Sequence, residues 1–449
     1  MPIRNAVIIG VALITSLVCY HKATHSRYAD QFVLAMQLVE DNYVEPVKAE
    51  QLFENAMMGM VGNLDEYSAY ISPQQFQLFS QNIDQQFVGI GIIVQGPPQT
   101  NQLTVVTPVY DSPAYRAGLR AGDVILEIDG QRAEMWSVDQ AVERIKGPQG
   151  TTVTLTIQHE GTDQRSTVVV ARDLIQTRSV LGDTRADHGK WNYYLEEDPT
   201  IGYIRITTFG ERTSEEMKDV LRFRGHPIKA LILDLRGNPG GLLSAAVEVS
   251  DMFINQGVIV SIRGRRKEDR ETYSASPKNT IFDPAIPMVV LVDGYSASAS
   301  EIVSACLKDH GRAAIVGQRT WGKGTVQNVI MMEHGKAALK LTTASYWRPN
   351  GKNIHRRRGA SEADDWGVRP SAGLEVVLTA EQYRKVLEQR RDRDILREGT
   401  EQPPHGPPAA SVIEDPQRKR AVEYLQSKSK DQNVKAARAG TPARQLKAA

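Results

Sequence analysis

Cysteine is scarce in this chain, since its 449 residues include only Cys19 and Cys306. Two cysteines cannot form the disulfide framework of a small secreted domain, so hydrophobic cores must hold the fold. None of the 9 histidines has zinc-ligand spacing such as His-Glu-x-x-His, which argues against a metal site. The 54 basic and 53 acidic residues nearly cancel, so no general attraction to nucleic acid is expected.

Long apolar runs are also nearly absent, and the clearest one covers residues 6–20, behind Arg4. Its length suits the core of a signal peptide and is short for a membrane span, which needs roughly 17–25 residues. No clear Ala-x-Ala cleavage site follows, so both cleavage and retention as an anchor stay open. We expect residues 1–26 to direct export to the periplasm or cell envelope, with membrane contact through this run if it is not cleaved.

Two short motifs carry residues suited to covalent catalysis. Residues 296–301 are three serines separated by alanine and followed by glutamate, and residues 320–327 contain a Gly-Lys-Gly turn. The serines come after an expected buried strand at 288–292 and lead into an apolar-periodic helix. A serine between a strand and a helix is held rigid and exposed. The backbone N–H groups at the start of the new helix point at the negative charge that develops during the reaction. A lysine whose pKa is lowered by burial can deprotonate that serine.

These motifs, with residues 308–313 and Gly317, closely resemble those of the carboxyl-terminal processing proteases, also called tail-specific proteases. The resemblance implies that Ser298 is the nucleophile and that Lys323 is its general base. It further implies that Gln327, one helical turn after the lysine, orients the lysine.

The same residues have other interpretations. Ser298 and Glu301 also fit a capping box, in which the serine only caps a helix. Lys308 is a competing base, but it falls inside the expected helix, where an exposed lysine is the default. His310 precedes a glycine at a helix end, where histidine usually favours the helix dipole. The lysine motif at the expected distance favours Ser298 with Lys323.

The glycine turn at residues 234–241 resembles the family's segment that faces the nucleophile. Such a turn can present an N–H group to the acyl oxyanion, and the N–H of Ala299 can supply a second one. We favour Gly241, while Gly240 and a plain structural turn stay open as alternatives. The aspartate and arginine that open this turn are interpreted as a structural ion pair.

A compact β-rich module is expected over residues 84–173. Its apolar patterning indicates strands and one helix at 103–108, 124–128, 138–145 (the helix), 153–157 and 168–170. Residues 87–92, 112–114 and 117–125 look like those of a PDZ domain. In this interpretation the turn Gly89, Ile90, Gly91 and Ile92 offers N–H groups to a terminal carboxylate, and the strand after it can pair with an extended peptide.

The resemblance covers about residues 28–378 and implies an α/β multidomain protein. In it, a PDZ domain is inserted between an N-terminal helical region and a ClpP/crotonase-like α/β serine protease core. The helical region has its break at Pro46. The last segment is rich in charge and proline, and we expect it to be a largely disordered tail with one short helix at 417–427. The expected divisions are 1–26, 27–83, 84–173, 174–385 and 386–449.

The function that the resemblance implies is an ATP-independent serine endopeptidase that forms an acyl-enzyme and needs no cofactor. Its expected partners are proteins or peptides with accessible C-termini, with an activating or adaptor protein as a further candidate. One alternative is a catalytically silent PDZ adaptor, against which the intact Ser298, Lys323 and Gln327 argue. Another is a crotonase-like hydrolase or isomerase of small molecules, where a peptide-binding module makes little sense.

Overall fold

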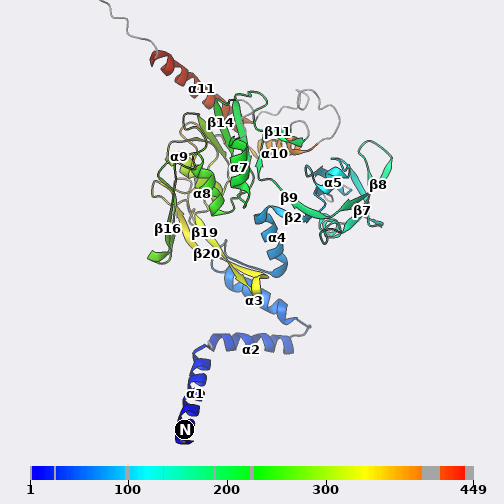
Figure 1. Ribbon diagram of the computed structural model, residues 1–449, viewed down its shortest axis with the longest axis vertical. Helices are drawn as coiled ribbons and strands as arrows, with labels where there is room; N and C mark the ends of the chain where they lie inside the picture. Colours follow the sequence, from blue (N-terminus) through cyan, green and yellow to red (C-terminus); the bar gives the residue numbers. More distant parts are fainter. Residues whose placement is uncertain are drawn as a thin grey trace, which may run out of the picture. The chain divides into compact units, whose positions relative to one another are not determined.

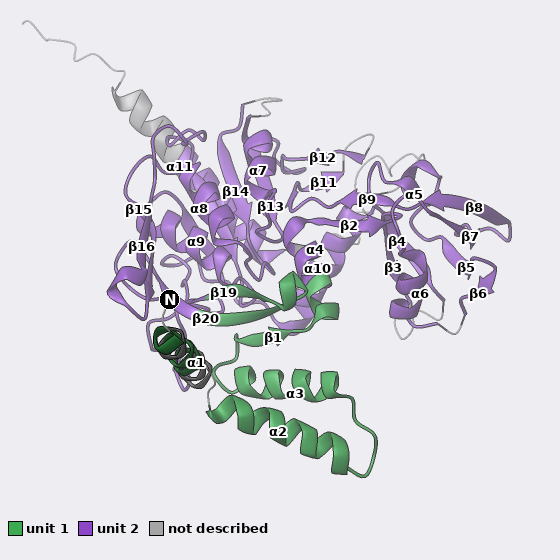
Figure 2. Cartoon of the chain, turned by 60° about the horizontal axis from the view of Figure 1, so that its bottom comes forward, with its two compact units in different colours: residues 1–77, 327–342 green, residues 78–326, 343–449 purple. Residues whose placement is uncertain are grey.

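The computed structural model describes residues 3–24, 27–96, 102–134, 136–185, 189–222, 227–396 and 415–439. The chain divides into two compact units, one of residues 1–77 and 327–342 and the other of residues 78–326 and 343–449 (Figure 2). Figure 1 shows the chain from its N-terminus in blue to its C-terminus in red, with many of the helices and strands labelled.

The smaller unit begins with three helices, the last two of which lie in the helical region expected over residues 27–83. These are α1 (Ile3–Thr24), α2 (Arg27–Asn42) and α3 (Ala49–Gly62), with the break between the last two near Pro46. β1 (Ala69–Ile71) then pairs antiparallel with the start of β20 (Ala337–Trp347), and Met57, Tyr70 and Ala337 form a small core. In the described residues, no helix combines the length and the apolarity that crossing a membrane requires.

The module expected over residues 84–173 is a sheet of antiparallel strands with two helices. Its sheet runs in the order β3 (Ile92–Gln95), β4 (Thr104–Pro108), β5 (Val124–Ile128), β7 (Thr152–Gln158), β8 (Arg165–Ala171), with β6 (Gln131–Arg132) beside β5. The helices are α5 (Pro113–Arg116) and α6 (Val138–Ile145), and the capping box of Ser137 and Gln140 begins α6 at the expected residue. The expected strands and helix are confirmed.

A second antiparallel pair, β2 (Gln86–Gly89) with β9 (Asp173–Gln176), forms where the chain enters and leaves this module. It follows α4 (Pro73–Asp84) and precedes the α/β core of the larger unit.

The core of the larger unit is a mostly parallel sheet between helical layers. The strand order is β10 (Val180–Leu181), β13 (Ile201–Ile206), β14 (Ala230–Asp234), β17 (Met288–Val292), β18 (Ala314–Gly317), and the last four are parallel. One face packs on α7 (Thr213–Arg222), α8 (Leu243–Asp251) and α9 (Ala299–Asp309). The expected βαβ units are therefore confirmed.

Outside the core sheet, β15 (Val258–Gly264) pairs with β16 (Arg270–Ser274) and with the end of β20. β19 (Thr325–Met332), most of which belongs to the smaller unit, also pairs with β20. β11 (Thr184–Arg185) pairs with β12 (Trp191–Asn192). Short 3₁₀ turns occupy Lys267–Asp269 and Glu333–Gly335.

The C-terminal segment differs from the largely disordered tail expected from residue 386. α11 (Pro416–Ala439) contains and extends the helix expected at 417–427, and α10 (Ala380–Asp394) is a second helix. Ala421 and Leu425 of α11 are buried on the second face of the sheet. The charges that suggested disorder pair with distant residues instead: Arg236 Nη1 donates to Asp415 Oδ1 at 3.0 Å. The rest of that expectation falls on residues 397–414 and 440–449, outside the described residues.

Ending the chain at residue 414 should destabilise the protein by about 3–5 kcal/mol, the usual cost of breaking a buried ion pair. The deletion removes the Asp415 partner of Arg236 and uncovers the apolar surface under Ala421 and Leu425. Urea unfolding would measure this loss, with a chain ending at residue 439 as the matched control. Equal stability of the two shortened chains would contradict a structural role for α11.

Candidate active site

The candidate nucleophile stands on a sharp turn between a strand and a helix. β17 ends at Val292, and α9 begins at Ala299, directly after Ser298. Ser298 has the backbone angles φ 55° and ψ −112°, which residues other than glycine rarely adopt. A strained serine between a strand and a helix is the geometry of a nucleophile elbow, which projects the hydroxyl group. Burial of Ser298 to 5% exposure helps the surroundings hold this conformation.

Hydrogen bonds distinguish the three serines of the motif. Ser296 Oγ donates to the carbonyl of Leu235, and Ser300 Oγ donates to the carbonyl of Asn238, both at 2.9 Å. The hydroxyls of Ser296 and Ser300 therefore hold residues 296–300 against the glycine turn. The hydroxyl of Ser298 instead hydrogen-bonds with the phenol of Tyr346, which is itself buried. This pattern favours the middle serine as the nucleophile.

Glu301 joins the serine motif to the lysine motif. Its Oε2 accepts the N–H of Ser298 at 2.9 Å and the N–H of Lys323 at 2.8 Å. Its Oε1 accepts the N–H of Gly322 at 2.7 Å and the hydroxyl of Thr320 at 2.5 Å. The carboxyl is completely buried, and this burial raises its pKa above the ordinary value although the four hydrogen bonds oppose the shift. Glu301 thus does more than cap α9: it fixes the lysine turn beside the serine.

The two glycines of the glycine turn have different roles. A β-carbon on Gly240 would lie 2.8 Å from the Cβ of Ser298, so this glycine permits the close approach of the two turns. The N–H of Gly240 donates to Asn238 Oδ1 at 2.8 Å and is therefore engaged. Within the described part of the chain, the N–H of Gly241 has no acceptor. This favours Gly241, together with Ala299 at the first position of α9, as the pair of oxyanion donors.

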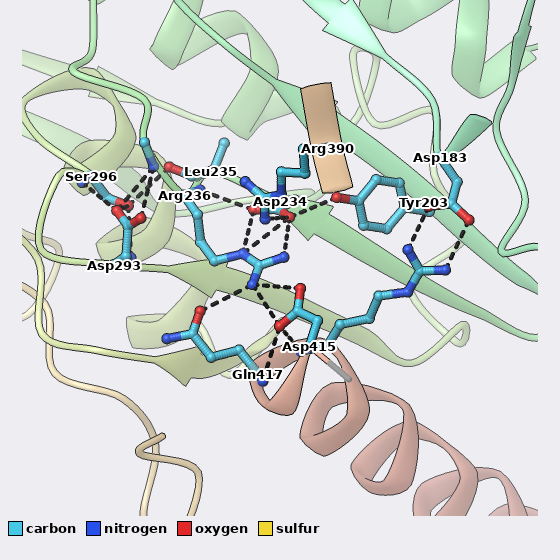
Figure 3. A network of polar contacts seen from close by, with 12 residues as sticks. Asp183, Tyr203, Asp234, Leu235, Arg236, Asp293, Ser296, Arg390, Asp415 and Gln417 are labelled. Carbon is cyan, nitrogen blue, oxygen red and sulfur yellow. Dashed lines mark hydrogen bonds and ion pairs between the residues drawn. The ribbon is translucent and has the colours of Figure 1, made fainter. Parts of the chain in front are cut away.

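The ion pair expected at the start of the glycine turn is confirmed and is part of a larger network (Figure 3). Arg236 Nη2 donates to Asp234 Oδ2 at 2.7 Å, and Arg390 Nη2 and the hydroxyl of Tyr203 donate to the same oxygen at 2.7 Å each. Burial alone would raise the pKa of Asp234, but the two guanidinium groups outweigh it and hold the pKa below its ordinary value. The network supports the base of the turn.

Asp293 attaches the same turn to the nucleophile elbow. Its Oδ1 accepts the N–H of Gly237 at 2.9 Å and the N–H of Ser296 at 3.0 Å (Figure 3). Because one carboxylate holds both turns, their relative position is fixed before any substrate binds.

The competing bases have other partners. Lys308 Nζ donates to the carbonyl of Arg369 at 2.7 Å, and its side chain lies at the far end of α9 from Ser298. His310 caps α9, as expected, and its Nε2 lies 2.7 Å from the carbonyl of Val258.

Gln327 belongs to the second segment of the smaller unit. There its Nε2 donates to Thr342 Oγ1 at 3.2 Å, and Thr342 Oγ1 in turn donates to Asp65 Oδ1 at 3.1 Å. Its expected role toward Lys323 stays a prediction.

In the loop of residues 89–92, the candidate binding site for a terminal carboxylate, two backbone carbonyls already accept hydrogen bonds within the protein. The carbonyl of Ile90 accepts the N–H of Ala114 at 2.9 Å, and the carbonyl of Gly91 accepts Ser112 Oγ at 3.0 Å. The loop runs from Gly89 into β3, which is an edge strand of its described sheet. An edge strand next to a loop with anchored carbonyls suits the addition of a peptide strand.

Two residues of this site escaped the sequence analysis. The capping-box pattern explains Glu301 locally, and its bonds to the lysine turn, 19 to 22 positions away, leave no local signal. Tyr346 was not selected at all, because its contact with Ser298 depends on the pairing of β20 with β15.

Three protein families match parts of this chain. Peptidase family S41 matches residues 200–370, the PDZ domain family matches residues 105–159, and the activating protease CtpB N-terminal domain matches residues 20–74. The carboxy-terminal-processing protease of Bartonella bacilliformis is 37% identical over 335 residues, which are 73% of this chain and 72% of that protein. The protease CtpB of Bacillus subtilis is 34% identical over 330 residues, which are 73% of this chain and 66% of that protein.

Among solved structures, the photosystem II D1 C-terminal processing protease is 25% identical, with a TM-score of 0.42, and the match covers 79% of this chain and 94% of that chain. The fold and the matches define an α/β multidomain serine endopeptidase with a peptide-binding PDZ domain. The chain belongs to the carboxy-terminal processing proteases of peptidase family S41.

Proposed function

We propose that this chain is an ATP-independent endopeptidase that uses Ser298 and Lys323 as a catalytic dyad. Lys323 takes the proton of the Ser298 hydroxyl, and Ser298 Oγ attacks the peptide carbonyl. The N–H groups of Ala299 and Gly241 hold the oxyanion while the amine product leaves. Water then hydrolyses the acyl-enzyme, and Gln327 orients the lysine throughout.

The main support for this proposal is that one carboxylate oxygen accepts hydrogen bonds from both the serine motif and the lysine motif. Glu301 Oε2 accepts the backbone N–H of Ser298 and that of Lys323, so both residues lie within hydrogen-bond reach of one buried atom. The lysine is half-buried, and its neighbours Gly322 and Gly324 are uncharged.

We further propose that the PDZ domain binds the C-terminal region of exported proteins before they are cleaved. Gly89, Ile90, Gly91 and Ile92 hold the terminal carboxylate, and β3 pairs with the peptide. The apolar run at residues 6–20 supports export to the periplasm or cell envelope, and fractionation with N-terminal sequencing would test both export and cleavage.

The test of the proposed function compares two peptides, identical except that one ends in a free acid and the other in an amide, without added nucleotide. We expect cleavage of the acid to be about tenfold or more faster, equivalent to roughly 1.4 kcal/mol of recognition. A silent adaptor would bind the acid without cleaving it. A small-molecule hydrolase would neither bind nor cleave either peptide.

Gly91→Glu should reduce kcat/KM for long protein substrates by about tenfold or more. Gly91 has φ 81°, and a β-carbon there would lie 2.3 Å from the Cβ of Ser112, so any side chain displaces the loop. Gly130→Ala is the matched control, because Gly130 has φ 75° with no atom within 4 Å of the added carbon. Unchanged turnover of long substrates by Gly91→Glu would count against recognition by the PDZ domain.

A further inference from the structure

Two hydrogen bonds in the smaller unit link Gln327 to the loop between α3 and β1. Gln327 Nε2 donates to Thr342 Oγ1 at 3.2 Å, and Thr342 Oγ1 donates to Asp65 Oδ1 at 3.1 Å. All three residues belong to this unit, where β19 pairs with β20 and β20 pairs with β1 (Figure 2). The hydroxyl that holds the Gln327 amide is thus tied to a carboxylate 277 positions earlier in the chain.

These two bonds have one direction, because Asp65 can only accept. Burial alone would raise the pKa of the Asp65 carboxyl, but hydrogen bonds from the Ser68 side chain, from two backbone N–H groups and from Thr342 hold it below its ordinary value. The carboxyl is therefore ionised at neutral pH, and the single proton of the Thr342 hydroxyl points to it. Since the oxygen of that hydroxyl then accepts, the end of the Gln327 amide that faces it is the NH₂ group. The carbonyl oxygen of the amide, Oε1, is turned away from Thr342.

Asp65 and Thr342 are themselves held in place by further bonds. Asp65 Oδ1 also accepts the N–H groups of Tyr67 and Ser68 at 2.8 Å each. Ser68 Oγ donates to Asp65 Oδ2 at 2.8 Å and accepts the N–H of Thr342 at 3.0 Å. Asp65 and Thr342 are therefore linked both directly and through Ser68, so neither side chain can rotate without breaking a bond. Support of this kind fixes the orientation of a side chain that the supported residues contact.

We propose that Asp65 and Thr342 are positioning residues of the catalytic dyad and act by orienting the Gln327 amide. This inference rests on the proposed function, in which Gln327 orients Lys323, and it identifies the end of the amide that does so. A neutral amine must keep its lone pair for the serine proton, so the group that orients it has to accept a hydrogen bond from one of its N–H groups. Gln327 Oε1 is such an acceptor, whereas a reversed amide would present donors in its place. The loop at residues 65–68 thereby contributes to catalysis without touching the substrate.

The first test is Thr342→Val, which keeps the shape of the side chain and removes the hydroxyl between Gln327 and Asp65. In the full chain, with one peptide substrate, we expect kcat to fall about tenfold with little change in KM, because the lysine is misoriented while substrate binding is untouched. Thr342→Ser keeps the hydroxyl and should restore most of kcat. Thr343→Val is the matched control: it makes the same change one residue along β20, at an exposed position, and should keep the parental rate. A parental kcat in Thr342→Val would overturn the inference.

The second test repeats Thr342→Val in a chain that already carries Gln327→Ala. A residue that acts through Gln327 has nothing left to orient there, so Thr342→Val should lower kcat no further, and the double-mutant cycle should show a coupling of about tenfold. A merely structural role predicts the same loss of kcat with and without Gln327, and that result would also overturn the inference. Thermal unfolding verifies the fold of each variant, and Thr342→Ala and Asp65→Ala repeat the cycle if valine disturbs the strand pair.

Failure of the proposed function would look different. A parent enzyme that cleaves no peptide would contradict the proposed function itself. A parental kcat in Gln327→Ala would contradict the proposed role of Gln327 and the inference with it. A slow Gln327→Ala together with a parental Thr342→Val would overturn the inference alone.

Discussion

Alanine in place of Ser298 or of Lys323 should reduce kcat by about 10⁴-fold or more, and the double variant should be no worse than either single variant. The losses do not add because the two residues are proposed to perform one step, the deprotonation and attack of the serine hydroxyl. Lys323→Arg should be equally inactive, since arginine stays protonated and cannot act as a base. Steady-state kinetics on one peptide substrate, with thermal unfolding to verify the fold, would measure all four variants.

The two outer serines provide the controls for this prediction. Ser296→Ala loses the bond to the carbonyl of Leu235, and Ser300→Ala loses the bond to the carbonyl of Asn238. Each should cost about 0.5–1.5 kcal/mol of stability and leave most of the activity. If Ser298→Ala stayed active while one of these two variants became inactive, the assignment of the nucleophile would be wrong.

Glu301→Gln should have the next largest effect, a fall in kcat of about 10²-fold, which is the scale of losing oriented polar contacts in an active site. Each carboxylate oxygen of Glu301 accepts two donors, so an NH₂ group in place of either oxygen would face two donors. The turn that carries Lys323 is then no longer held beside Ser298. Kinetics and urea unfolding on the same samples would separate loss of rate from loss of stability.

The pH dependence of stability gives this prediction a sign. Burial raises the pKa of the Glu301 carboxyl in the folded protein above its value of about 4.3 in the unfolded chain. The free energy of unfolding that Glu301 contributes therefore falls as the pH rises from the unfolded pKa to the higher folded pKa. The stability advantage of the parent over Glu301→Gln should therefore shrink over that rise. Glu143→Gln, at an exposed position on α6, is the control and should change neither rate nor this profile. A parental rate in Glu301→Gln would contradict the positioning role.

The elements that the sequence predicted well are those whose signals are local. α6 begins at the expected residue because Ser137 and Gln140 supply a capping box, and β17 matches its apolar run without error. The sequence predicted less helix after residue 380 than the structure contains, because α10 and α11 are stabilised by residues far away in the sequence. The pairing of Arg236 with Asp415 joins residues 179 positions apart, and composition alone cannot reveal it.

The same distinction applies to the site. Ser298 and Lys323 stand in compact motifs, so sequence alone could select them. The link between Glu301 and Lys323 spans 22 positions. It follows no periodicity, since it depends on how the turns meet in the folded unit. The choice of Gly241 over Gly240 likewise required the bond from Gly240 to Asn238.

Covalent labelling tests the central claim, the dyad of Ser298 and Lys323, most directly. The full chain would be treated with a serine-directed fluorophosphonate without nucleotide, and the labelled residue identified by mass spectrometry of the peptide that contains residues 296–301. The account predicts one adduct, on Ser298, whose formation slows strongly in Lys323→Ala. An adduct on Ser296 or Ser300, or labelling of Ser298 at the same rate without Lys323, would contradict it.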